Sequence, residues 1–179
     1  MSHCFERTLT GINFDIFNPT SDMFDIRDIA RSLAVKPRFN GFTKVPYSVA
    51  QHCLYASQFD AGDDRIAMDN LLHEIGETYL CDCPTQIKKL WTGFKQCEEN
   101  ILFAGLMKYT GRDRFVDPLW THTVDLRLRT TEAHQLMNGD KEWYLNFPDK
   151  AYDFVIDPLD WHVAEKMFLT RFEQLGGTL

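Results

Sequence analysis

The helical character of the chain is clearest in the stretch Ile66-Ala67-Met68-Asp69-Asn70-Leu71-Leu72-His73-Glu74-Ile75. Apolar residues recur along it three to four positions apart, which predicts one buried face of an α-helix. Turn-forming residues 60–64 precede this stretch, and Pro84 follows it. We therefore predict a single helix that starts within 60–64 and ends before Pro84, with His73 and Glu74 well inside it.

Similar patterns predict further helices on both sides. Asp25 and Ser48 can cap two of them, while Asp117-Pro118 and Asp157-Pro158 place a capping residue before a proline suited to the first helical position. The helices are expected over about 25–36, 48–59, 94–109, 117–137 and 157–175. The apolar stripe of the last one is predicted at Val163, Ala164, Met167, Phe168 and Leu175.

Strand signals are scarce. Residues 8–17 alternate loosely and predict either a short hairpin or an extended arm, which residues 18–22 then break. The rest of the chain consists of helical patterns joined by short polar turns, without a repeat or a shift in composition. The sequence therefore predicts an all-α fold, a single domain over residues 1–179 with about six or seven helices.

The composition is that of an ordinary globular protein. Of 179 residues, 44% are hydrophobic and 25% are charged, which argues against a disordered chain. The net charge of −7 argues against a general nucleic-acid binder, because such proteins need a basic surface. No apolar run reaches the roughly 18 residues that a membrane span requires. An acidic protein that handles phosphates would need a local basic pocket or a metal.

The cysteine pattern indicates free thiols. There are five, at Cys4, Cys53, Cys81, Cys83 and Cys97. An odd number, together with an N-terminus unlike a signal peptide, predicts a reducing, cytoplasmic compartment. Two of the thiols flank Asp82, but no second pair follows at zinc-site spacing, so we do not expect a cysteine zinc site.

Two histidines and two acids on predicted helices are candidate metal ligands: His52, His73, Glu74 and Asp125. Ionisable groups on inward helix faces are costly unless they are paired, hydrogen-bonded or bound to metal. Two imidazoles and two carboxylates from three helices can converge on one divalent cation, and mixed nitrogen and oxygen donors suit transition metals better than calcium. The spacing alone also allows a structural histidine beside solvated charges.

Four short stretches distinguish these alternatives. They are Tyr47-Ser48-Val49-Ala50-Gln51-His52, Leu71-Leu72-His73-Glu74-Ile75-Gly76-Glu77, Cys81-Asp82-Cys83-Pro84-Thr85-Gln86-Ile87-Lys88 and Val124-Asp125. In this order they resemble the HD-domain phosphohydrolase family. The similarity is to its small single-domain branch, which contains bacterial 5′-deoxynucleotidases and phage deoxyadenosine-triphosphate triphosphohydrolases. It covers about residues 22–137, most of the chain.

The resemblance implies that His52, His73, Glu74 and Asp125 are the metal ligands. It also shows one departure, because the family has His-Asp where this chain has His73-Glu74. Glutamate can ligate as aspartate does, but its carboxylate lies one methylene further out. The site should therefore be slightly rearranged relative to the family.

The resemblance implies roles for four further residues. Glu77 matches an acid near the metal and the substrate phosphate, and Asp82 matches an acid that orients the attacking water. Arg38 and Lys88 match cations that contact phosphate. Without the resemblance, each of these four residues would be interpreted as an ordinary turn, cap or surface residue. Phe39 offers a flat face for a base, although it could equally belong to the core.

The helical spacing adds a geometric expectation for Glu77. It lies one turn beyond His73, so the two side chains are predicted to share a face of the same helix.

The function implied by the resemblance is a metal-dependent phosphohydrolase acting on deoxyribonucleotides. We expect dATP to be converted to deoxyadenosine and triphosphate, because the short chain, the Arg-Phe-x-Gly segment at residues 38–41 and the stretch 47–52 look closest to the phage enzymes. One alternative is a 5′-deoxynucleotidase acting on monophosphates. Another is a nucleotide-binding module without turnover.

The same resemblance implies the cofactor and the partners. The metal would be a divalent transition ion, zinc, cobalt or manganese, and a second divalent ion could join the substrate phosphates. The expected partners are a nucleotide and further copies of the chain, with no membrane and no nucleic acid. The expected location is the cytoplasm, or the host cytoplasm if the chain is phage-encoded.

Overall fold

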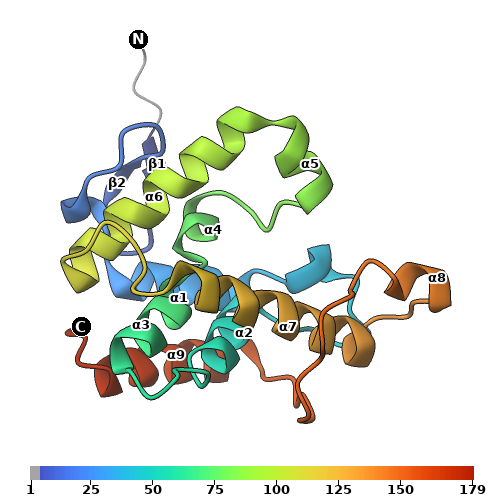
Figure 1. The fold of residues 1–179 in the computed structure, drawn as a ribbon. Helices are drawn as coiled ribbons and strands as arrows, with labels where there is room; N and C mark the ends of the chain where they lie inside the picture. Colours follow the sequence, from blue (N-terminus) through green and yellow to red (C-terminus); the bar gives the residue numbers. More distant parts are fainter. Residues whose placement is uncertain (1–4) are drawn as a thin grey trace.

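The computed structural model describes residues 5–179; the first four residues, and with them Cys4, lie outside this range. The chain is mainly helical, with one small two-stranded sheet near the N-terminus (Figure 1). The helices are α1 (Ile26–Val35), α2 (Val49–Ala56), α3 (Asp64–Leu72), α4 (Ile75–Tyr79), α5 (Thr85–Leu90), α6 (Thr92–Thr110), α7 (Pro118–Leu136), α8 (Lys141–Tyr144) and α9 (Trp161–Gln174), with short 3₁₀ turns at Ser21–Met23 and Arg38–Gly41.

The N-terminal residues form a hairpin, the first of the two predicted alternatives. Strand β1 (Phe5–Arg7) pairs antiparallel with β2 (Asn13–Asp15). The hairpin is fixed to the helices by Phe14, which is fully buried and stacks on the ring of Tyr79 at the end of α4. Packing of the buried Phe14 ring on the partly buried Tyr79 ring explains why so short a sheet keeps a defined place.

Three helix starts predicted from capping residues are confirmed. The side chain of Asp25 accepts a hydrogen bond from the backbone N–H of Arg27, at the start of α1. Ser48 caps α2 and Asp117 caps α7 in the same way. Each cap satisfies an N–H group that the first turn of a helix leaves without a partner.

The predicted start of the last helix at Asp157-Pro158 is wrong. Helix α9 begins at Trp161, where Asp160 caps it by accepting from the N–H of His162. Residues 157–159 are held by Gln51 instead, which donates to the carbonyl of Asp157 and accepts from the N–H of Leu159. The carbonyl of Asp157 thus accepts from a side chain, whereas in a helix starting at Pro158 it would accept from the N–H of Trp161.

The apolar stripe predicted for this helix is only partly correct. The buried residues of α9 are Ala164, Phe168 and Phe172, whereas Val163 and Met167 are each 45% exposed. The stripe is therefore narrower than the composition of the helix suggests, because α9 covers the core along one line of contact.

The helix predicted to run through His73 and Glu74 is interrupted there. Helix α3 ends at Leu72 and α4 starts at Ile75, with Glu74 outside helical geometry at φ −100° and ψ 18°. The carbonyl of Asn70 accepts a hydrogen bond from the ring of His73, and a continuous helix would offer that carbonyl to the N–H of Glu74. Other boundaries differ as well, since α2 ends at Ala56 and the short helices α5 and α8 were not predicted.

The core lies where α1 packs against α2, α4 and α9, and where α6 covers α4. Fully buried side chains at its centre include Ile29, Leu33, Leu71 and Phe168. Helix α6 approaches α4 closely at Gly105, where a Cβ atom would lie 2.9 Å from the side chain of Ile75. Within the described residues, no helix combines the length and apolar character needed to cross a bilayer.

Replacing Phe168 with alanine should destabilise the fold by about 3–5 kcal/mol, because it removes a fully buried ring and leaves a cavity. The half-exposed Val163→Ala variant on the same helix is the matched control and should change stability by much less. Urea unfolding followed by circular dichroism measures both. Equal losses for the two variants would contradict the assignment of the buried face of α9.

Candidate metal centre

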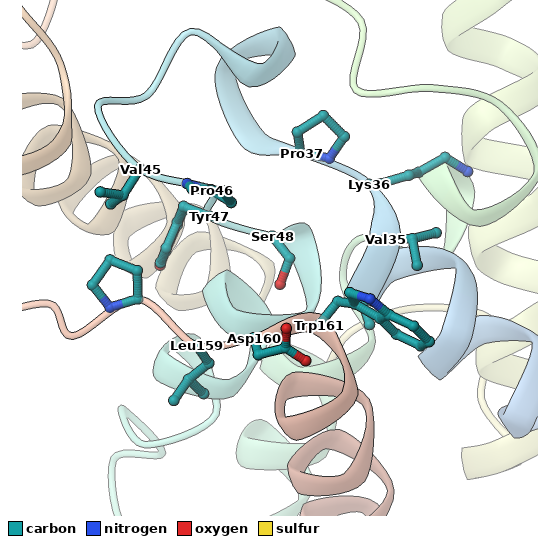
Figure 2. Close-up of a pocket in the computed structure, with 12 residues that line it drawn as sticks. Val35, Lys36, Pro37, Val45, Pro46, Tyr47, Ser48, Leu159, Asp160 and Trp161 are labelled. Atoms are coloured by element: carbon teal, nitrogen blue, oxygen red, sulfur yellow. The ribbon is translucent and has the colours of Figure 1, made fainter.

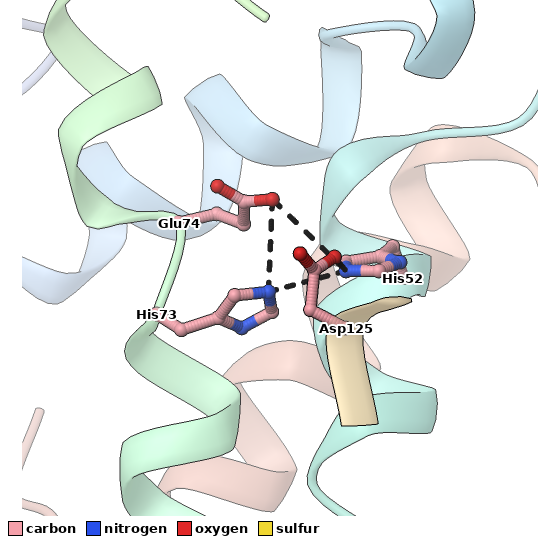
Figure 3. Close-up of side chains that lie close together, drawn as sticks. All are labelled: His52, His73, Glu74 and Asp125. Atoms are coloured by element: carbon pink, nitrogen blue, oxygen red, sulfur yellow. Dashed lines mark hydrogen bonds and ion pairs between the residues drawn. The ribbon is translucent and has the colours of Figure 1, made fainter. Parts of the chain in front are cut away.

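Four side chains from three parts of the chain meet at one point. His52 comes from α2, His73 and Glu74 from the junction of α3 and α4, and Asp125 from α7 (Figure 3). One donor atom of each lies within 4.8 Å of the others. The prediction placed these residues on helices that would bring them together, and the structure does so.

The interruption between α3 and α4 allows adjacent residues to face one site. In a continuous helix, neighbouring side chains point about 100° apart, so His73 and Glu74 would diverge. Because the chain turns at this junction, Glu74 Oε1 lies 3.6 Å from His73 Nε2 and both face the same point. Glu77 does not share a face with His73, contrary to the prediction, because it belongs to the separate helix α4.

The spacing of the donor atoms fits a single ion. His52 Nε2 lies 3.1 Å from His73 Nε2, 3.3 Å from Asp125 Oδ1 and 4.0 Å from Glu74 Oε1. Nitrogen and oxygen ligands bind a transition ion at about 2.1 Å, so donors around one ion lie up to about 4.2 Å apart. The three separations from His52 lie within that limit, whereas the full set of four donors spans up to 4.8 Å and would have to contract slightly around an ion.

The hydrogen bonds of the two rings leave their Nε2 atoms free to bind metal. His73 Nδ1 donates to the carbonyl of Asn70 at 2.7 Å, and a carbonyl can only accept. His52 Nδ1 lies 2.7 Å from the carboxylate of Glu132. In the neutral rings both Nε2 lone pairs therefore point at each other across 3.1 Å, an arrangement that a cation between them would stabilise.

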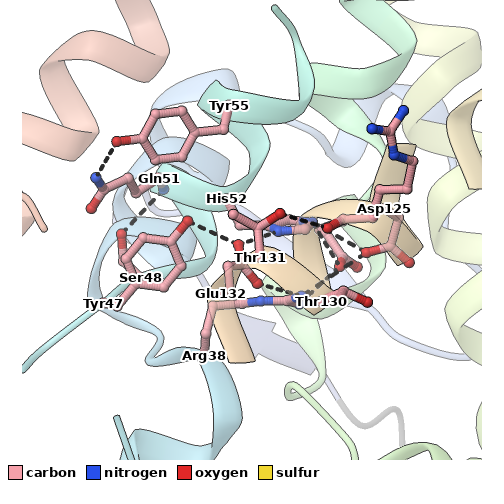
Figure 4. A network of polar contacts seen from close by, with 12 residues as sticks. Arg38, Tyr47, Ser48, Gln51, His52, Tyr55, Asp125, Thr130, Thr131 and Glu132 are labelled. Atoms are coloured by element: carbon pink, nitrogen blue, oxygen red, sulfur yellow. Dashed lines mark hydrogen bonds and ion pairs between the residues drawn. The ribbon is translucent and has the colours of Figure 1, made fainter. Parts of the chain in front are cut away.

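The residue that orients His52 was not predicted. Glu132 on α7 is fully buried and binds three groups at once, His52, the hydroxyl of Tyr47 and the guanidinium of Arg38 (Figure 4). The sequence carries a signal for it, since Glu132 lies seven residues after Asp125 and therefore on the same face of a helix. A carboxylate behind a ligating histidine fixes its tautomer and raises its basicity.

The pKa values of the two histidines move in opposite directions. Burial and Arg38 disfavour the charge on His52, but the carboxylates of Glu132 and Asp125 outweigh them and raise the pKa of His52 to about 9. For His73, burial dominates and lowers the pKa. The carboxylates that stabilise a proton on His52, Glu132 and Asp125, would also stabilise a metal cation bound at its Nε2 atom.

The charges around the donors suit a divalent cation. Burial opposes the ionised form of Asp125 and Glu132, but His52 and Arg38 nevertheless hold the pKa of each carboxyl below its ordinary value. With Glu74, three carboxylates surround the single guanidinium of Arg38, which lies 3.2 Å from Glu74 and 3.4 Å from Glu132. When His52 is neutral, as metal binding requires, the cluster therefore keeps about two uncompensated negative charges.

All the other predicted site residues, together with two of the donors, line one cavity of about 550 Å³. The predicted residues in its lining are Arg38, Phe39, Glu74, Glu77, Asp82, Lys88 and Asp125. Its volume falls within the range of small-molecule sites. The structure therefore brings together the residues predicted for catalysis, for phosphate and for a base.

Glu77 and Lys88 face each other in this cavity. Glu77 is 2% exposed, and its Oε1 atom lies 3.7 Å from Lys88 Nζ. Burial, with the negative charges of Glu74 and Asp82, raises the pKa of Glu77. Lys88 also donates to Glu98 at 2.6 Å. Among the described residues, the buried atoms Glu77 Oε2 and Arg38 Nε have no hydrogen-bond partner, so the chain itself leaves two polar groups beside the donors unsatisfied.

A second cavity, of about 680 Å³, lies between the start of α9 and the segment that joins α1 to α2 (Figure 2). Apolar residues such as Tyr47 and Trp161 form most of its wall. Its charged groups are already engaged, since Lys36 donates to the carbonyl of Thr78 and Asp160 caps α9. None of the predicted site residues lines it.

Comparison with known proteins finds relatives without an assigned activity. The chain is 31% identical over 177 residues to the uncharacterized protein YfdR of Escherichia coli strain K12, a match that covers 96% of each protein. It is 30% identical over 117 residues to the uncharacterized protein RCAP_rcc00048 of Rhodobacter capsulatus, with 61% of this chain and 60% of that protein covered. No protein-family model matches the chain.

Proposed function

The chain belongs to the family of the Escherichia coli protein YfdR, and we propose that it is a metal-dependent phosphohydrolase of the HD-domain type that acts on nucleotides. One observation carries the proposal. Two imidazoles and two carboxylates meet within 4.8 Å, and the two carboxylates line a cavity that also holds Arg38 and Lys88. A metal beside two cations is an arrangement suited to a phosphate ester.

His52, His73, Glu74 and Asp125 would hold the metal. When bound, a divalent ion lowers the pKa of a coordinated water and withdraws charge from a phosphate oxygen. Glu132 keeps the ring of His52 in the ligating orientation through its contact with Nδ1.

The acids of the cavity would handle the proton of the attacking water. Asp82 is partly exposed in the cavity and can orient a water molecule there. Glu77 is buried with a raised pKa, so it can accept or hold a proton at Oε2, the atom without a partner among the described residues. Arg38 and Lys88 would neutralise the phosphate oxygens. Each would have to divide its hydrogen bonds between its present carboxylate partner and the substrate.

We propose dATP as the substrate, cleaved at the first phosphorus to deoxyadenosine and triphosphate. This choice depends on the resemblance to the phage enzymes. The alternative reaction is hydrolysis of deoxynucleoside 5′-monophosphates, and the alternative without chemistry is nucleotide binding alone. Under each of these three proposals, the aromatic residues of the cavity favour a nucleotide over a phosphate ester without a base.

A panel of deoxy- and ribonucleoside mono-, di- and triphosphates, incubated with the protein and a divalent metal, tests this proposal. We expect triphosphate and deoxyadenosine from dATP, with products separated by chromatography. Inorganic phosphate from monophosphates alone would favour the 5′-nucleotidase, and binding without turnover would favour the binding module.

The length of the Glu74 side chain should matter less than its charge. Glu74→Asp should keep part of the metal and part of the turnover, because the carboxylate retreats by only one methylene. Glu74→Ala should lose most of both, because the site loses one of its four ligands. Metal content and hydrolysis are measured on the same samples. Full activity in Glu74→Ala would show that this carboxylate is not a ligand.

A further inference from the structure

The cavity beside the donor cluster has a second group of lining residues that the metal chemistry does not use. They come from the end of α7 and from the segment around α8, and they are mostly apolar: Arg129, Met137, Trp143, Asn146 and Phe147. With Phe39 they provide three aromatic rings, beside the exposed Phe42, in the lining of a cavity that also contains the cations Arg38 and Lys88.

The segment that carries these rings is held by its own hydrogen bonds. Asp140 caps α8 by accepting from the N–H of Trp143. The hydroxyl of Tyr144 donates to the carbonyl of Met137 and accepts from the N–H of Gly139. Asn146 donates to the carbonyl of Trp143 at 2.7 Å. A helix of only four residues thus keeps a defined conformation and presents its rings in fixed positions.

Gly139 is the residue against which the indole lies. A Cβ atom at this position would stand 2.2 Å from Cε3 of Trp143, closer than side chains allow. The missing side chain therefore lets the ring rest on the backbone. This contact makes Gly139 a positioning residue for Trp143 and offers a way to move the ring without removing it.

The three rings are inclined to one another. Trp143 and Phe147 have centroids 4.7 Å apart and planes at 50°, while Phe39 and Phe147 lie 6.4 Å apart at 59°. Phe147 is nearly buried at 9% exposure, whereas Phe39 and Trp143 are partly exposed. Because the rings of Trp143 and Phe147 are in contact, a flat group would lie against the side of the rings that faces the cavity rather than between them.

Arg129 adds a cation that the protein does not neutralise. It lies one turn after Asp125 on α7, about 6 Å further along the helix. Its guanidinium lies 5.0 Å from the ring centroid of Phe147. Arg38 and Lys88 are both paired with carboxylates, whereas Arg129 forms no ion pair with any carboxylate of residues 5–179. Its donors remain available for acceptor atoms of a ligand.

We propose that Trp143 and Phe147 form the nucleobase subsite of this enzyme, with Arg129 donating hydrogen bonds to the edge of the base. The inference rests on the proposed function, because it places the base of the substrate whose phosphate lies beside the metal. Flat rings stack on every base, and a guanidinium can donate a hydrogen bond to a ring-nitrogen acceptor of adenine such as N7. Trp143, Phe147 and Arg129 therefore select nucleotides over phosphate esters that lack a base.

The test compares the binding of dATP with that of inorganic triphosphate, which has the same phosphates but no base. Titrations by calorimetry use the full chain with its divalent metal, with Asp82→Asn as the common background so that dATP is not hydrolysed during the measurement. Trp143→Ala should raise the Kd for dATP roughly 5- to 150-fold, the usual loss for one stacked base, and leave the Kd for triphosphate unchanged. Gly139→Ala should weaken dATP in the same direction, and Trp143→Phe should restore part of the affinity.

The matched control is Leu145→Ala, because Leu145 is 78% exposed on the same segment and does not line the cavity. It should change neither Kd. An unchanged Kd for dATP in Trp143→Ala, or an equal loss for both ligands, would overturn the subsite. Arg129→Gln should likewise weaken dATP more than triphosphate, and an equal loss would overturn its placement at the base.

These outcomes can be separated from a failure of the proposed function. If dATP binds through Trp143 but is not cleaved, the subsite holds and the hydrolase proposal fails. If dATP is cleaved while Trp143→Ala binds it normally, the hydrolase proposal holds and the subsite fails.

Discussion

Replacing Asp82 with asparagine should lower kcat by roughly 10²–10⁴-fold, the usual contribution of a positioned acid or base. The change removes the charge but keeps the size of the side chain, so the cavity should keep its shape. Asp82 is not among the four donors, and metal binding should therefore be retained. Steady-state hydrolysis and metal content, measured on one preparation, check both halves of this expectation.

A matched control variant shows whether removal of any acidic side chain lowers turnover. Asp153 is exposed and does not line the cavity, so Asp153→Asn should keep full turnover. Loss of metal or of folded protein in Asp82→Asn would instead assign Asp82 to the structure of the loop before α5.

Replacing His73 with alanine should remove the metal and abolish turnover. The ring supplies one of two nitrogen donors, and its Nδ1–H bond to Asn70 holds it in the ligating orientation. Loss of one of four ligands weakens binding strongly, because the remaining donors cannot complete the coordination. Elemental analysis after dialysis measures the effect.

His134→Ala is a suitable control, because His134 is an exposed residue of α7 outside the donor cluster. It should keep the metal of the unchanged protein. Equal metal content in the His73→Ala and unchanged proteins would contradict the ligand assignment.

Helix starts could be predicted because their causes are local. A capping side chain binds an N–H group two or three residues away, so Asp25, Ser48 and Asp117 carry the information in adjacent positions. The failure at Asp157-Pro158 has a cause far away in the sequence. Gln51 binds the backbone of this segment from α2, more than a hundred residues earlier, and no local pattern shows it.

The four donors could be chosen from residue types and family order, but their geometry could not. A helical pattern runs unbroken through residues 66–75, and in a continuous helix the side chains of His73 and Glu74 would point about 100° apart. Their convergence depends on a turn in which the ring of His73 binds the carbonyl of Asn70. Such competition between a side chain and the helix backbone is not visible in hydrophobic periodicity.

Glu132 and Trp143 show two further limits. Glu132 stands in a stretch of polar residues that resembles a solvated helix face, and its burial follows from the contacts with His52, Tyr47 and Arg38. Trp143 has no assignable role in the sequence, because α8 is too short to leave a periodic signal. Its place in the cavity depends on the contact of its ring with Gly139, and hydrophobic periodicity does not show such a contact.

The central claim is that His52, His73, Glu74 and Asp125 hold one catalytic metal. The most direct test is elemental analysis of the purified protein, before and after removal of metal with a chelator, with dATP hydrolysis followed on the same samples. We expect about one divalent transition ion per chain, loss of hydrolysis when it is removed, and recovery when zinc, cobalt or manganese is returned. Full hydrolysis by protein that contains no metal would contradict the claim.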